Sequence, residues 1–179
     1  MRYFRKIVGE RLYLSPFDAS DTDIHAKWAE WMNDRAVCDT FGGHGNNVTR
    51  TSARMDVEAL TGHRFVMVLL DGDILIGQIS LHNIDHMHRR AFMGIMLGEA
   101  EHRGKGYGTE AVRLILNYGF NTLNLNNISL SVHVDNAAGI ACYKKVGFQE
   151  TGRRREWYFK DGKYIDNIYM DILAREFVG

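Results

Sequence analysis

Apolar residues recur along the chain with two periods, and each period predicts one type of element. Alternation of apolar and polar residues predicts a first strand over 10–16. Apolar residues at helical spacing predict a helix over 20–34, behind candidate capping residues. The glycine- and asparagine-rich stretch 41–47 predicts a loop, and a short second helix is expected at 49–60.

The rest of the chain alternates between strand-like and helix-like patterns. Two apolar runs, 65–70 and 74–81, are joined by Asp-Gly-Asp, which is typical of a hairpin. The remaining predicted elements are a strand over 91–97, a helix over 107–121, a strand over 128–134, a helix over 136–146 and two late strands that turn at 161–162. No repeat and no shift in composition marks a linker, so we expect one domain over 1–179.

Composition narrows the function classes. Of 179 residues, 45% are hydrophobic and 25% charged, as in an ordinary globular protein. Lys plus Arg and Asp plus Glu are both 22, so no net charge attracts nucleic acid or an anionic membrane. Two cysteines, Cys38 and Cys142, exclude a disulfide framework, and the histidines of 82–88 lack the partners of a metal site. With no leader-like or membrane-length apolar run, we expect a cytoplasmic protein without nucleic-acid, membrane or metal partners.

Three alternate glycines follow the predicted strand 91–97. Gly104, Gly106 and Gly108 alternate with other residues, and the cations Arg103 and Lys105 stand among them. Glycine adopts positive φ readily and lets backbone N–H groups approach a ligand, while the start of the following helix offers unpaired donors. The stretch therefore predicts a cradle for a pyrophosphate.

The spacing of these glycines excludes two common phosphate loops. A Walker loop needs Ser or Thr after its lysine, but Gly106 follows Lys105. A dinucleotide fingerprint needs glycine at its sixth position, where Thr109 stands. Instead, the spacing of Arg103, Gly106 and Gly108 resembles the coenzyme A pyrophosphate loop of the GNAT N-acetyltransferases.

A second motif of that family follows in the expected order. Asn136, Tyr143 and Gly147-Phe148 resemble it, and the resemblance covers roughly the last two thirds of the chain. It implies an α/β (α+β) fold with one mixed, mostly antiparallel sheet of about seven strands, splayed central strands and about four helices. The opening Arg-Leu strand, the Trp-rich first helix and the closing strand at 162–173 most resemble the ribosomal-protein alanine acetyltransferase (RimJ/RimL-type) subgroup.

The resemblance also implies roles for individual residues. Backbone N–H groups of Met96, Leu97 and Gly98 would hold the thioester carbonyl of acetyl-CoA as a catalytic clamp. Asn136 would contact the pantetheine arm, and Tyr143 would also contact the coenzyme and act as general acid. The pyrophosphate would be bound by Arg103, Gly104, Lys105, Gly106, Tyr107, Gly108 and Thr109.

The general base is the residue that the resemblance does not supply. Many relatives carry a glutamate after Arg-Arg-Ala, whereas Phe92 follows Ala91 here. Glu99, His133 and a relayed water remain candidates. Deprotonating an amine of pKa about 10.4 at pH 7.4 costs about 4 kcal/mol, against under about 1 kcal/mol for an α-amine near 8. A weakly basic amine is therefore easier to acetylate when the site has no strong base.

These implications give an acetyl-CoA-dependent N-acetyltransferase in which a primary amine attacks directly in a ternary complex. The subgroup favours a protein N-terminal amine, whereas 88–91 resembles spermidine acetyltransferases and favours a polyamine. Within 38–48 only Asp39 is acidic, which disfavours a polycation, and an amino sugar or aminoglycoside stays open. The alternatives are a coenzyme A-binding sensor without turnover and a nucleotide-phosphate-binding domain. Dimerisation and closure of the 38–48 loop also stay open.

Overall fold

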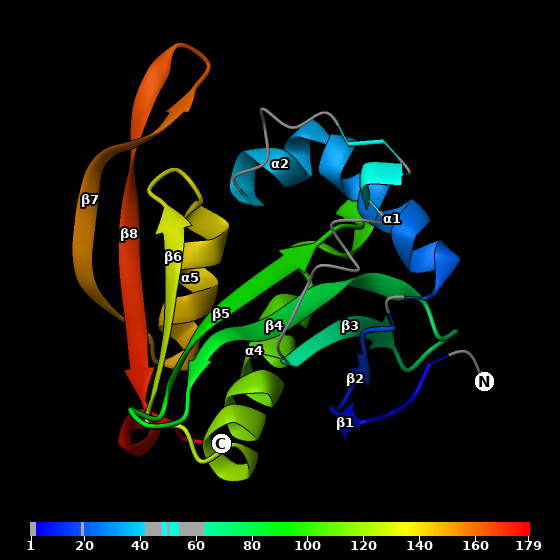
Figure 1. The fold of residues 1–179 in the computed structure, drawn as a ribbon, viewed down its shortest axis with the longest axis horizontal. Coiled ribbons are helices and arrows are strands. Elements are labelled where there is room, and N and C mark those ends of the chain that lie inside the picture. The colour runs from blue at the N-terminus through cyan, green and yellow to red at the C-terminus, as the bar shows by residue number, and fades with distance from the viewer. Residues whose placement is uncertain (1–2, 19, 42–47, 50, 54–62) are drawn as a thin grey trace.

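The computed structural model describes residues 3–18, 20–41, 48–49, 51–53 and 63–179, and it contains one eight-stranded sheet (Figure 1). The strand order is β1-β2-β3-β4-β5-β6-β8-β7, and every neighbouring pair is antiparallel except β5 and β6. The strands are β1 (Ile7–Val8), β2 (Leu12–Pro16), β3 (His63–Leu69), β4 (Leu75–Asp85), β5 (Arg90–Leu97), β6 (Asn127–His133), β7 (Gln149–Lys160) and β8 (Lys163–Leu173).

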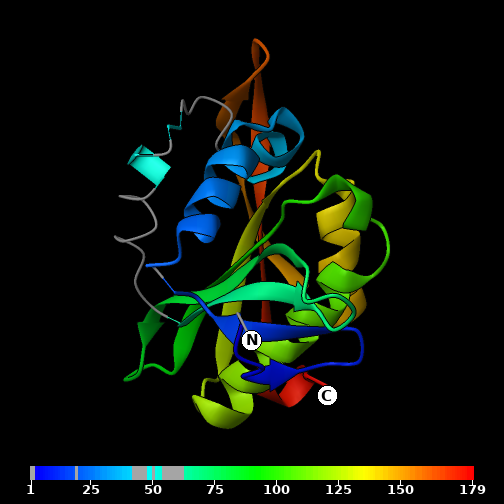
Figure 2. The same cartoon turned by 90° about the vertical axis from the view of Figure 1, so that its right-hand side faces the viewer.

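Helices cover both faces of the sheet (Figure 2). Their bounds are α1 (Thr22–Asn33), α2 (Arg35–Phe41), α4 (Tyr107–Asn117), which continues into a π-helical turn at Tyr118–Thr122, and α5 (Ala137–Val146), with single 3₁₀ turns at Ala100–His102 and Ala174–Glu176. Trp28 and Trp31 of α1 pack with Val66 and Met96 on one face. On the other face, α4 and α5 pack on the alternate residues of the same strands, so the sheet separates two apolar cores.

The sheet opens in its middle. β5 and β6 pair in parallel only where Arg90–Phe92 lies beside Asn127–Ser129. Beyond this short ladder the two strands diverge, and the glycine loop and α5 follow at their diverging ends (Figure 1). The backbone of β5 after Phe92 consequently has a partner on its β4 side but not on its β6 side. We call this opening the split.

The structure differs from the predicted elements at two places. The sheet has eight strands where about seven were expected, because the two-residue β1 carries no readable period. No element was predicted between the helix that ends at 34 and the loop at 41–47, but α2 occupies this segment, with Asp34 Oδ1 accepting a hydrogen bond from the Ala36 N–H at 2.8 Å. The expected helix at 49–60 and the loop at 41–47 lie largely outside the described residues.

Candidate active site

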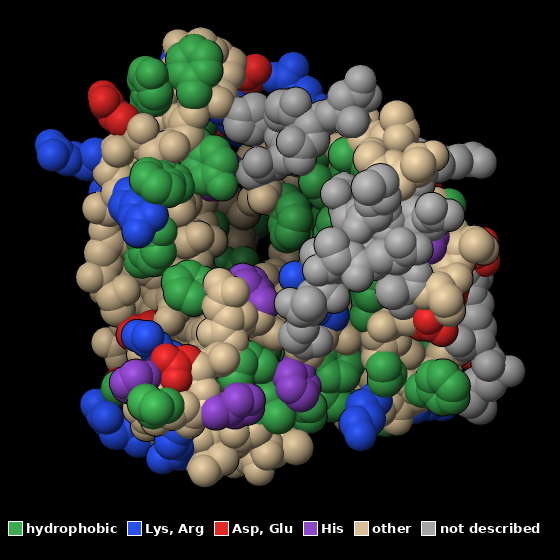
Figure 3. All heavy atoms as spheres, viewed as in Figure 1, with side chains coloured by type: hydrophobic (Ala, Val, Ile, Leu, Met, Phe, Trp, Pro, Cys, Tyr) green, Lys and Arg blue, Asp and Glu red, His purple; other side chains and the backbone are tan. Residues whose placement is uncertain are grey.

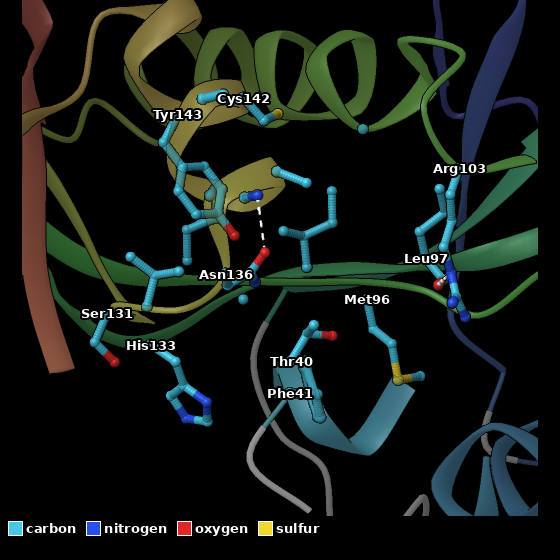
Figure 4. A pocket seen from close by; sticks show the side chains of 18 of the residues that line it. Thr40, Phe41, Met96, Leu97, Arg103, Ser131, His133, Asn136, Cys142 and Tyr143 are labelled. Carbon is cyan, nitrogen blue, oxygen red and sulfur yellow. Dashed lines mark hydrogen bonds between the residues drawn. The ribbon is translucent and has the colours of Figure 1, made fainter. Parts of the chain in front are cut away.

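The split is part of a cleft of about 650 Å³. Residues of α2, β4, β5, the glycine loop, β6, α5, β7 and β8 line this cleft. In Figure 3 it appears as a hollow bordered largely by hydrophobic side chains. Figure 4 shows Tyr143 and Cys142 entering it from α5, whereas Thr40, Phe41 and His133 lie on the opposite side. The cleft thus connects the α4/α5 face of the sheet with the α1/α2 face.

The glycine loop forms one wall of the cleft. Gly104 has φ +72°, and a Cβ added there would meet no atom within 4 Å, so its backbone is open on that side. Gly106 has φ +85° and is the N-cap of α4, with no side chain capping the helix. The first-turn N–H groups of a helix have no intrahelical partner, and with Gly108 and Thr109 they border the cleft. Donors of this kind fit a bound pyrophosphate.

Two residues that the sequence analysis did not single out hold this loop in place. Glu110 in the first turn of α4 accepts hydrogen bonds from the Arg11 backbone N–H at 2.8 Å and from Arg11 Nε at 2.9 Å. Arg11 Nη1 donates to the Lys105 carbonyl at 2.9 Å, and the guanidinium lies over the Tyr107 ring. The Lys105 carbonyl and the Tyr107 ring are thereby engaged with Arg11, and neither residue is among those that line the cleft.

Of the three backbone N–H groups expected to hold the thioester carbonyl, only one is available at the edge of β5. The Gly98 N–H donates to the Ile76 carbonyl at 3.0 Å, so this group is occupied within the sheet. Donors alternate sides along an antiparallel strand, so the Met96 N–H also points to β4 and the Leu97 N–H points toward the split. The prediction for Gly98 is corrected: its role is steric, since a Cβ there would lie 2.1 Å from the Trp31 ring.

Arg103 ties the loop to the end of β5. Its guanidinium donates to the Gly98 carbonyl at 2.8 Å and to the Leu97 carbonyl at 3.3 Å, as Figure 4 shows in part. Its own backbone N–H donates to the Ala100 carbonyl at 3.1 Å. The Arg103 backbone N–H is thus engaged within the loop, and any contact of Arg103 with a pyrophosphate would come from its side chain, which borders the cleft.

Two residues of the second motif, Asn136 and Tyr143, reach the cleft from α5. Asn136 is the N-cap, and its Oδ1 accepts from the Gly139 N–H at 2.9 Å, which leaves Nδ2 as a donor toward a ligand. Tyr143 is buried and packs edge-on against Phe148. Burial, and next the nearby Cys142, raise the pKa of the Tyr143 phenol, so it stays protonated at neutral pH and can donate. Figure 4 shows its hydroxyl pointing into the cleft.

Glu99 is bound by partners from α1. Its Oε1 accepts from Lys27 Nζ at 2.6 Å and from Trp31 Nε1 at 3.1 Å. Burial alone would raise the pKa of Glu99, but these two hydrogen bonds, together with the charge of Lys27 and a contribution from His102, place the pKa below its usual value. Glu99 is also not among the residues that line the cleft. This arrangement contradicts its expected role as general base.

The structure adds His82 to the cleft, a residue that the sequence analysis considered only as a metal ligand and set aside. His82 lies opposite Phe92 across the β4–β5 ladder, and both border the cleft. Burial, together with the charge of Arg64, lowers the pKa of His82, so its imidazole is neutral at pH 7. His133 also lines the cleft and is 4% exposed. The sequence analysis had named His133 as a candidate base, whereas no sequence signal distinguishes His82 from the other histidines.

The Cys142 thiol borders the cleft but is not activated. Burial raises its pKa, which outweighs the opposing hydrogen bond with Thr109, so the thiol is neutral and a poor nucleophile. Within the described residues, no cluster of three His, Cys, Asp or Glu side chains could hold a metal ion. Among the helices of that part of the chain, none is long and apolar enough to cross a bilayer.

The described lining of the cleft contains no carboxylate, and its cations are Arg103 and Lys145. Asp39 stands near the end of α2, but its carboxylate is shared between Arg35 at 3.6 Å and Lys160 at 3.7 Å. Among the residues that the structure describes, the cleft therefore offers an uncharged wall on the α2 side rather than an anionic one.

Comparison with known proteins identifies the family. Residues 11–149 match the acetyltransferase (GNAT) domain. The uncharacterized N-acetyltransferase p20 of Bacillus licheniformis is 30% identical over 176 residues, 95% of this chain and 97% of that protein. YdaF of Bacillus subtilis, provisionally named a ribosomal N-acetyltransferase, is 37% identical over 112 residues, 63% of this chain and 60% of that protein.

Solved structures support the same family. The spermidine N-acetyltransferase of Vibrio cholerae, solved with CoA and spermine, superposes with a TM-score of 0.78 at 28% identity over 92% of this chain and 96% of that one. This chain belongs to the GNAT family, and the predicted fold class is confirmed. It is an acetyl-CoA-dependent N-acetyltransferase.

Proposed function

We propose that the described fold acts as one catalytic domain in which acetyl-CoA occupies the split and a weakly basic primary amine attacks the thioester from the α2 side. The acceptor that we favour is a protein N-terminal α-amine, in line with the ribosomal-protein acetyltransferase subgroup. One observation carries the proposal: the glycine loop, the unpaired edge of β5 and the Tyr143 hydroxyl border a single cleft that passes through the sheet.

Each part of the coenzyme has a matching group in this cleft. The pyrophosphate would lie against Gly104, Gly106 and the first turn of α4, where N–H donors and the helix dipole favour an anion. The pantetheine amides would pair with the backbone of β5 on its unpaired side and with Asn136 Nδ2. The thioester would then lie between Leu97 and Tyr143.

Direct transfer requires a C–N bond to form and the C–S bond to break. The Leu97 N–H would stabilise the negative charge that develops on the carbonyl oxygen. Tyr143 would give its phenolic proton to the departing sulfur and recover a proton from solvent. The attacking nitrogen must release a proton, and the imidazoles of His82 and His133 lie on the α2 side of the cleft to receive it.

The charge of the cleft supports a weakly basic acceptor. A polycation is best held by carboxylates, and the described lining has none, while Asp39 is already shared by two cations. An α-amine has a pKa near 8, so about half of it is neutral at that pH, and a neutral imidazole is a sufficient base for it. These two arguments favour the α-amine over a polyamine.

A polyamine is the second candidate, and one observation favours it. The Vibrio cholerae relative that was solved with CoA and spermine matches this chain over most of its length. A polyamine acceptor would require the cationic end of the substrate to find its anionic partners outside the described lining of the cleft.

The test is release of free thiol from acetyl-CoA in the presence of alanine-first peptides, spermidine, glucosamine or an aminoglycoside, with coenzyme binding measured in parallel. We expect the peptide to give the highest kcat/KM. Higher kcat/KM with spermidine would replace the favoured acceptor. Tight coenzyme binding without release would favour a sensor, and ATP binding as tight as that of coenzyme A would refute the assignment of the cleft.

A further inference from the structure

We infer that Asn167 of β8 binds the acceptor amine, its carboxamide oxygen accepting a hydrogen bond from the attacking nitrogen. The inference rests on the proposed function and adds a residue that selects the acceptor. Asn167 is 2% exposed and lines the cleft. Its Oδ1 has no hydrogen-bond partner among the described residues. Buried polar atoms are nearly always paired, so this oxygen is a place where a ligand completes the structure.

The strand register places Asn167 on the acceptor side of the cleft. Asn167 lies directly opposite His133 in the β6–β8 ladder, so the two side chains share one face of the sheet. Figure 4 shows His133 on the same side of the cleft as Phe41 of α2. The Tyr158 ring lies over the His133 ring with centroids 3.9 Å apart. We call His133, Tyr158 and Asn167 the β8 corner; all three line the cleft.

An irregularity in β7 builds this corner. Arg154 is paired with Asn167 and Tyr158 with Ile165, so four residue steps of β7 are opposed by two of β8. Within the bulge Glu156 has φ +52°, and its N–H donates to Asp166 Oδ1 at 2.9 Å. Bulges bend a strand and redirect its side chains, and they are frequent beside active sites. The bulge next to Asn167 therefore accounts for the turn of Tyr158 toward the cleft.

The chemistry of a carboxamide suits the reaction. Its oxygen is a neutral acceptor, so it orients an N–H group without the charge that would hold an amine in its protonated form. A carboxylate at this place would bind an ammonium more strongly but would raise the pKa of the amine and slow the attack. The neutral oxygen of Asn167, among described lining residues that include no carboxylate, fits an acceptor that must be uncharged when it attacks.

The test compares Asn167→Leu with a matched control, Gln78→Met. Gln78 is also a buried carboxamide whose oxygen lacks a partner in the described chain, but it is not part of the cleft lining. With an alanine-first peptide and with spermidine, we expect Asn167→Leu to raise the acceptor KM about tenfold and to leave the acetyl-CoA KM within about twofold. Gln78→Met should leave both KM values within about twofold.

Two further measurements distinguish a role of Asn167 in acceptor binding from a purely structural role. Because Asn167→Leu removes an unpaired buried oxygen, its thermal midpoint should stay equal or rise by a few degrees. Asn167→Asp keeps an acceptor oxygen but adds charge, so its activity should recover at more alkaline pH.

An unchanged acceptor KM in Asn167→Leu, with wild-type activity intact, would overturn this inference alone. A wild-type protein that acetylates neither probe nor any other amine would overturn the proposed function, and this inference with it.

Discussion

Replacing Tyr143 by Phe isolates the proton-donor step from the rest of the site. The substitution removes one hydroxyl and keeps the ring, which packs against Phe148 in a buried position. We therefore expect the free energy of unfolding to change by less than about 1 kcal/mol. Binding of acetyl-CoA should be nearly unchanged, because the loop and the β5 edge do not involve this hydroxyl.

The size of the effect on turnover follows from the leaving group and its surroundings. A thiol of pKa about 8.5 that leaves unprotonated at pH 7.4 is penalised by about 1.5 kcal/mol in water. The burial that raises the pKa of Tyr143 disfavours a thiolate at the same place, so the penalty in the cleft is larger. We expect kcat to fall about 100-fold, or about 2.7 kcal/mol, which is at the low end for a general acid.

The assay is free-thiol release at saturating acetyl-CoA between pH 6 and 10. Tyr13→Phe is the control. Tyr13 lies on β2 outside the cleft lining, and its hydroxyl donates to Asp73 Oδ1 at 2.8 Å. Loss of this hydroxyl should lower the free energy of unfolding by about 1 kcal/mol without changing turnover. Because the pKa of Tyr143 is raised, the wild type should show no alkaline loss of kcat from this group across that range. Wild-type turnover in Tyr143→Phe would refute the general-acid assignment.

Three further changes test other parts of the account. Gly106→Val forces a branched residue to φ +85° at the α4 N-cap, so the acetyl-CoA KM should rise at least about tenfold in steady-state assays. Glu99→Gln should leave kcat within about threefold while losing up to about 1 kcal/mol of stability with the Lys27 ion pair; a 100-fold loss of kcat would restore Glu99 as the base. Glu110→Ala should lower the free energy of unfolding by about 2 kcal/mol in urea denaturation and raise the acetyl-CoA KM, and an unchanged KM would remove Arg11 and Glu110 from the support of the loop.

Elements with a long apolar period could be predicted from the sequence. Ala111, Val112, Ile115 and Leu116 recur at helical spacing, and all four are fully buried on α4. The seven-residue α2 could not, because it buries only Val37 and Cys38 and its start depends on a cap rather than a period. Helices with a long apolar period can therefore be predicted from the sequence, and short helices cannot.

The same distinction applies to the site. The glycine loop and Tyr143 stand in local motifs, so their neighbours in the sequence are also their neighbours in the cleft. Glu99 depends on Lys27 and Trp31, which are 72 and 68 residues away in sequence, so its engagement is visible only in the fold. Asn167 and His82 enter the cleft through strand pairing, and an unpartnered oxygen leaves no trace in a sequence.

The most direct test of the central claim follows both products of one reaction. The wild-type protein is incubated with acetyl-CoA and an alanine-first peptide while free thiol is titrated and the peptide mass is recorded. The account predicts one N-terminally acetylated peptide for each thiol released, and a rate about 100-fold lower in Tyr143→Phe. Thiol release without peptide acetylation, or neither product with any amine, would contradict it.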